Sequence, residues 1–241
     1  MLRELLSVFR SSTGPVAEMG VDFTKMVKLS IENTLVAGEI YFGRRATPEE
    51  RSRIYEQDVE INKLERTIRK RVAAHLSFKG SYLDVPYCLL MMSLVKDVER
   101  IGDYAKNLAE VVDIHPDGLP DGEIVRELQE IRRGVEESCR ASAEIFESSD
   151  RERAMALITK GRDLAHRCDA LIAKNARSSF DASTTTAIVL GIRYYKRIGG
   201  HVLNVLTSVV MPLHKVDYYD EDEIHRGDHS SPGPVRLTTA R

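Results

Sequence analysis

Residues 95–110, VKDVERIGDYAKNLAE, combine the apolar spacing of a helix that packs into a core with three acids in close succession. Residues four apart on a helix share a face, so Glu99 and Asp103 project together, one turn apart. Asp97 lies well round the helix, and Asn107 continues the row of Glu99 and Asp103. The stretch therefore predicts a core helix that carries an acidic row on one side.

A second row of the same kind precedes this one, because Asp58 and Asn62 are also four apart in a helical segment. Neighbouring carboxylates repel one another unless a cation lies between them. Oxygen ligands suit hard divalent cations, and carboxylates also hold iron. Two rows on antiparallel helices would face each other and form one site. The predicted metal ligands are Glu99, Asp103, Asp58 and Asn62, with Asp97, Arg100 and Asn107 in supporting positions.

The same residues permit a simpler interpretation. Acids on a helix are usually its solvated face, and Arg100 is placed to pair with Asp97 or Asp103 without any metal. Gly102, in mid-helix, costs about 1 kcal/mol relative to alanine, so its small size serves either close helix packing or a ligand. The spacing alone leaves both interpretations open.

The skeleton of this helix occurs twice. Residues 193–204 read RYYKRIGGHVLN, so the tripeptide of residues 100–102 recurs at residues 197–199, 97 positions later. Asn107 recurs as Asn204 at the same spacing. Four identities in register favour a duplicated unit over chance.

Six long segments have the helical period, and strand-like alternation is scarce. Residues 115–122, with two prolines and two glycines, separate three segments from three others. We therefore predict an all-α protein of two tandem three-helix repeats that form an elongated six-helix bundle. The repeats span residues 1–115 and 121–213, and residues 214–241 form an acidic, mostly disordered tail.

Composition excludes several classes. Among 241 residues, 35 Lys and Arg nearly balance 37 Asp and Glu, which gives no electrostatic reason to bind nucleic acid. Three cysteines without a CxxC pair predict buried thiols in a reducing cytoplasm. The N-terminus is a poor signal peptide, and no stretch approaches the roughly 20 apolar residues of a transmembrane helix.

The stretch ERIGDYAKNLAE closely resembles the signature of the PhoU family of phosphate-uptake regulators, and the likeness covers almost the whole chain. The resemblance implies two three-helix repeats whose E(D)xxxD motifs bind clusters of iron, zinc or other divalent ions. It also implies a non-enzymatic, commonly dimeric cytoplasmic protein. Such a protein restrains a phosphate-responsive sensor histidine kinase and acts with the ATPase-driven phosphate ABC transporter at the membrane face.

By this resemblance, Glu99 and Asp103 fill the motif of the first repeat. Asp58 and Asn62 fill the motif of the preceding helix, with asparagine in place of the second acid. The metal ions implied by the family would therefore bind to the first repeat.

The second repeat departs from the family pattern. Lys196 occupies the position that matches Glu99, and Gly200 the position that matches Asp103. On the preceding helix Asp163 remains, but Arg167 follows four residues later. We expect no metal in this half.

Other classes remain as alternatives. A histidine-phosphotransfer protein would use His75, but Lys79 follows four residues later rather than the three that we expect of that motif. A ferritin-like oxidase would need Glu-x-x-His pairs, which the sequence lacks. An adaptor would dock a partner through a patch such as Tyr194, Tyr195 and Lys196, although the tyrosines also suit a core. An accessory role beside a sodium–phosphate cotransporter is a further alternative.

Overall fold

The computed structural model describes residues 14–78 and 81–216, and within these ranges the chain is helical with no strand. The expected all-α fold is thus confirmed. Predictions for the N-terminus and for most of the tail concern residues 1–13 and 217–241, which lie outside the described part. The helices are α2 (Pro15–Tyr41), α3 (Pro48–Leu76), α4 (Val85–Ile114), α5 (Glu123–Ser148), α6 (Arg151–Asn175) and α7 (Ala182–Val210), with short 3₁₀ turns η1 (Ser81–Asp84) and η2 (Leu213–Lys215).

Local signals explain where these helices begin. Before α3, Thr47 and Glu50 form a capping box, with Pro48 in the first turn, so that the free N–H groups of the helix end are bonded. Asp150 and Asp181 cap α6 and α7, each accepting a backbone N–H three residues later. These polar caps fix the helix register, and with it the face that each helix turns inward.

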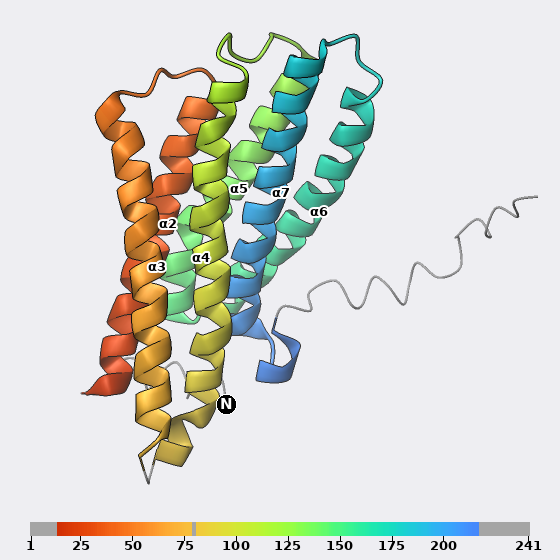
Figure 1. Ribbon diagram of the computed structural model, residues 1–241. Helices are drawn as coiled ribbons and strands as arrows, with labels where there is room; N and C mark the ends of the chain where they lie inside the picture. Colours follow the sequence, from red (N-terminus) through yellow and green to blue (C-terminus); the bar gives the residue numbers. More distant parts are fainter. Residues whose placement is uncertain (1–13, 79–80, 217–241) are drawn as a thin grey trace, which may run out of the picture.

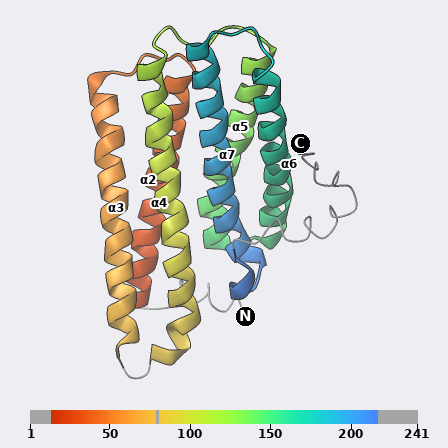
Figure 2. The same ribbon diagram turned by 45° about the vertical axis from the view of Figure 1, so that its right-hand side comes forward.

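The six long helices run up and down in turn, in two groups of three (Figure 1). The first group is α2, α3 and α4, and the second is α5, α6 and α7. The groups lie side by side, with α4 against α7, as Figure 2 also shows. Helix α4 packs on α2, α3 and α7, so it occupies the centre of the bundle.

One apolar core extends through both groups. Phe23 of α2 and Phe146 of α5 lie 5.1 Å apart between ring centroids. The Tyr41 hydroxyl of α2 donates to the carbonyl of Ala187 on α7 at 3.0 Å. Contacts of this kind make the two repeats one packed unit. In the described ranges, none of the helices combines the length and apolarity that a bilayer crossing requires.

Candidate functional site

The contact of α3 with α4 brings the predicted acidic rows together. Asp58 of α3 is buried, whereas Glu99 and Asp103 of α4 are half-buried on the side toward α3. Gly102 permits this approach, because a Cβ there would lie 2.8 Å from the Cδ1 atom of Ile61 on α3. Close helix packing therefore accounts for the mid-helix glycine.

A lysine lies between the two rows. The Lys106 Nζ atom donates to Asp58 Oδ2 at 3.1 Å and to Asp103 Oδ1 at 3.2 Å. Burial lowers the pKa of Lys106, but the hydrogen bonds to both carboxylates outweigh it and raise the pKa above its ordinary value. The ammonium is thus charged at neutral pH and links α3 to α4.

Glu99 has less compensation than its neighbours. Burial raises the pKa of its carboxyl, and the charges of Glu65, Asp103 and Asp58 raise it further. Arg100 opposes this shift from 3.4 Å, and its Nη1 atom also lies 3.6 Å from Asp103. The site is therefore an acidic surface whose cations are the side chains of Lys106 and Arg100.

These residues do not fit a resident metal ion as they are arranged. Across residues 14–78 and 81–216, no three His, Cys, Asp or Glu side chains are grouped so as to hold one. The place between Asp58 and Asp103 belongs to the Lys106 ammonium. Asn62 is half-buried on α3 and adds no charge. The predicted ligands Asp58 and Asp103 come near one another, but they surround the ammonium group of Lys106.

Asp97 belongs to a different contact. It is buried, and its Oδ1 atom accepts from His201 Nδ1 at 2.7 Å and from Asn204 Nδ2 at 2.8 Å, both on α7. The His201 ring also stacks on Tyr104, with centroids 5.8 Å apart. Asp97 therefore joins the two repeats and does not support the acidic row.

The remaining predicted residues have modest roles. Arg100 pairs with Asp103, one of the two partners that the simpler interpretation offered, and also with Glu99, which it did not name. Asn107 is half-buried on α4. Sequence reasoning missed Lys106, although its spacing of three from Asp103 places it on the same helix face.

Known proteins resemble this chain in both sequence and fold. The family model described as PhoU domain matches residues 16–112, which contain α3, nearly all of α4 and both acidic rows. Residues 16–112 are thus similar in sequence to a PhoU domain, and the matched segment is called the PhoU domain below. The matched segment includes all seven residues singled out from the opening sequence stretch and its partner row.

The fold of the PhoU domain and of the helices after it resembles solved PhoU structures. The crystal structure of PhoU from Pseudomonas aeruginosa superposes with a TM-score of 0.74 at 18% identity, covering 86% of this chain and 99% of that one. The phosphate transport system regulatory protein PhoU from Streptococcus pneumoniae gives 0.67 at 17% identity, covering 86% and 95%. No curated protein sequence matches the chain significantly.

The helices that follow the PhoU domain lack its acidic row. Lys196 of α7, the counterpart of Glu99, donates to both carboxylate oxygens of Asp169 on α6 at 2.6 Å. Arg167 of α6 donates to Glu130 of α5 at 2.7 Å. Asp163 is exposed. In this half, the positions that match the acidic rows carry the basic side chains of Lys196 and Arg167, and these side chains link neighbouring helices.

His75, the candidate for phosphotransfer, lies at the last turn of α3. Its Nε2 atom is 2.8 Å from Asp84 Oδ2 at the start of α4, and its side chain is 16% exposed. Lys79, which that alternative also required, lies outside the described residues. The helix ends at Leu76, so the Lys-Gly pair follows the helix end as expected. His75 thus joins the ends of two helices.

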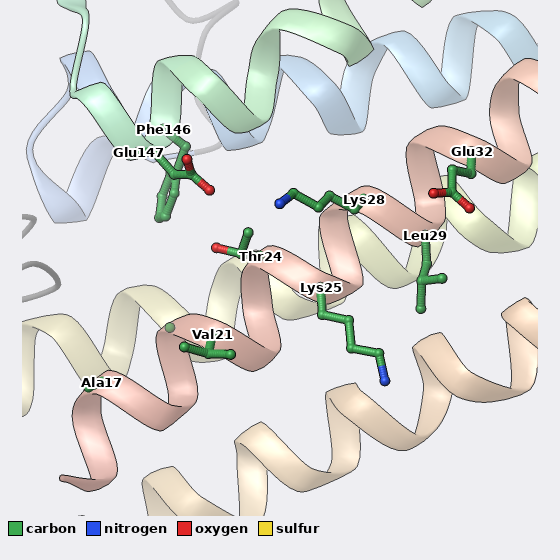
Figure 3. Close-up of a pocket in the computed structure, with 10 residues that line it drawn as sticks. Ala17, Val21, Thr24, Lys25, Lys28, Leu29, Glu32, Phe146 and Glu147 are labelled. Carbon is green, nitrogen blue, oxygen red and sulfur yellow. The ribbon is translucent and has the colours of Figure 1, made fainter. Parts of the chain in front are cut away.

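A groove of about 770 Å³ lies on the surface of the PhoU domain, along α2 and beside the end of α5 (Figure 3). Val21 lies in it with 70% of its surface exposed. Lys25 points away toward α3, where it pairs with Glu60 at 2.8 Å. Phe146 and Glu147 close the groove from α5. Apolar contact area with charged edges is typical of binding surfaces.

Proposed function

We propose that this protein regulates phosphate uptake and the response to phosphate starvation by binding other proteins. The observation that carries the proposal is the PhoU domain at residues 16–112, on a fold shared with a protein named as a phosphate transport system regulator. PhoU is a regulatory, non-enzymatic family, and we place this chain in that role. Its site of action is the cytoplasmic face of the membrane, where uptake proteins expose their soluble parts.

The proposed partners are a phosphate-responsive sensor histidine kinase and the ATPase of a phosphate ABC transporter. Docking suits a rigid helical bundle, since binding to a pre-organised surface loses little conformational entropy. The apolar groove along α2 and the acidic face of α3 and α4 are two surfaces of different chemistry on one domain. The protein is also proposed to act as a homodimer. Light scattering should then give a mass in solution of twice 27.2 kDa.

The binding proposal is tested with the full chain immobilised on a biosensor. The probes are the soluble cytoplasmic part of the phosphate-responsive kinase, the transporter ATPase and, as a matched control, a kinase of the same architecture with another stimulus. Binding to the first two and not to the control is expected. Absence of binding to both, or equal binding to the control kinase, contradicts the proposal.

A further inference from the structure

Both halves of the protein use a lysine–aspartate pair to join their second and third helices. In the PhoU domain, Lys106 of α4 reaches Asp58 of α3 at 3.1 Å. In the second half, Lys196 of α7 reaches Asp169 of α6 at 2.6 Å. Ionised donor and acceptor make such hydrogen bonds stronger than neutral ones. In each half, a lysine ammonium on the third helix therefore links that helix to the second.

The two pairs differ in what surrounds them. The Lys106 side chain is 21% exposed and Asp58 is 13% exposed, with Asp103 and Glu99 close by. The Asp169 side chain is 55% exposed and has Lys196 as its direct partner. An ammonium at the first position therefore offsets the repulsion of several carboxylates, whereas the second forms a surface pair.

Lys106 and a metal ion exclude each other. Metal–oxygen distances of about 2.0–2.6 Å would place a divalent ion between Asp58 and Asp103, where the Nζ atom lies. Two cations in that space would repel each other, and hydrogen bonds to both carboxylates hold the Nζ atom there. Removing the ammonium would leave Asp58 and Asp103 facing one another without their shared cation, with Glu99 nearby.

We propose that Lys106 is the built-in cation of the acidic site on α3 and α4, and that it makes the site independent of divalent metal. The lysine links α3 to α4 between Asp58 and Asp103 and excludes other cations. With a neutral side chain in its place, the carboxylates of Asp58, Asp103 and Glu99 can regroup around one divalent cation. The inference concerns this site alone and does not depend on the partners proposed above.

The test compares Mn²⁺ and Zn²⁺ binding, by isothermal titration and elemental analysis, after treatment with chelator. The variants of the full chain are Lys106→Gln, Lys96→Gln and Lys196→Gln. Lys96 is an exposed lysine on the same helix, and Lys196 pairs with an aspartate of the second half that has no acidic cluster around it. We expect K106Q to bind about one ion per chain, at least about tenfold tighter than wild type, and its melting temperature to rise when the ion is added. Both controls should behave as wild type.

Two results overturn the proposal. One is wild-type protein that binds a stoichiometric ion and loses it on Asp103→Asn substitution. The other is folded K106Q, by circular dichroism, that binds no better than wild type. If K106Q does not fold, the wild-type titration with Asp103→Asn decides alone: binding that the substitution abolishes overturns the proposal, and no such binding supports it. This comparison also separates the site from weak binding elsewhere in the chain.

Discussion

Asp97 of α4 and His201 of α7 are joined by a hydrogen bond of 2.7 Å at the contact between the two three-helix groups. Asn204 adds a second bond to the same carboxylate oxygen, and Asp97 is only 6% exposed. A buried carboxylate needs such partners, since an unpaired one costs several kcal/mol. The relationship explains why α4 and α7 keep one register.

Asp97→Ala is expected to lower the free energy of unfolding by about 2–4 kcal/mol, because the half-buried side chains of His201 and Asn204 lose their acceptor. Asp97→Asn should cost less, since an amide oxygen still accepts. Thermal or urea unfolding measures both. Asp163→Ala, at an exposed helical position, is the control and should stay within about 0.5 kcal/mol of wild type. Equal effects of D97A and D163A would contradict this account.

Gly102→Ala should destabilise the protein by about 1–3 kcal/mol, because the added methyl meets the Ile61 Cδ1 atom at 2.8 Å in a packed core. Ile61→Val removes that atom and alone costs about 0.5–1.5 kcal/mol. The double variant is expected to cost less than the sum of the two single variants. Urea unfolding of all four proteins gives the coupling energy.

The control for this cycle is Gly199→Ala in the second repeat. Its Cβ would lie 3.4 Å from Val135, so the clash is slight and helix propensity favours alanine by up to about 1 kcal/mol. G199A should therefore be neutral or mildly stabilising. A loss as large as that of G102A would show that crowding is not the cause.

Glu99→Gln should stabilise the protein at pH 7 and not at pH 4. The pKa of Glu99 is raised in the folded state above 4.5, so the folded protein holds more protons than the unfolded chain just above that pH. Stability therefore falls as pH rises through this window, and the loss persists at neutral pH. Melting temperatures from pH 4 to 8 test the sign.

Glu144→Gln is expected to change the stability at pH 7 in the opposite direction. A hydrogen bond from Arg153 lowers the pKa of Glu144, so ionisation of this residue favours the folded state. E144Q is expected to lose stability at pH 7, and the loss should disappear as the pH falls below the ordinary glutamate pKa. If E99Q and E144Q shift in the same direction at pH 7, burial is not what governs Glu99.

Lys106→Ala and Lys196→Ala should differ in cost. Removing Lys106 leaves two partly buried carboxylates without their shared donor and is expected to cost about 1–3 kcal/mol. Removing Lys196 breaks a largely exposed pair worth about 0–1 kcal/mol. Denaturant midpoints compare the two, and a larger loss for K196A would be inconsistent with the burial of the first pair.

Periodicity and the Pro/Gly-rich break at residues 115–122 were sufficient to predict six helices in two groups, because both are local properties of the chain. The capping box at Thr47 marks the start of α3, and the tripeptide of residues 100–102 revealed the repeat. The partners of Asp58 and Asp97, in contrast, lie far from them in the sequence. Whether Lys106 or a metal compensates Asp58 depends on which α4 side chain reaches α3, and Asp97 finds its partners 104 and 107 positions later. Such pairings need the packed helices.

The central claim, regulation of phosphate uptake, is tested most directly by a phosphate-starvation reporter in the native host. The gene is deleted and then restored, and reporter output is measured with ample phosphate. The account predicts a reporter that is switched on in the deletion strain despite the phosphate and is repressed again by the restored gene. An output identical to wild type in the deletion strain, with ample and with limiting phosphate, would contradict it.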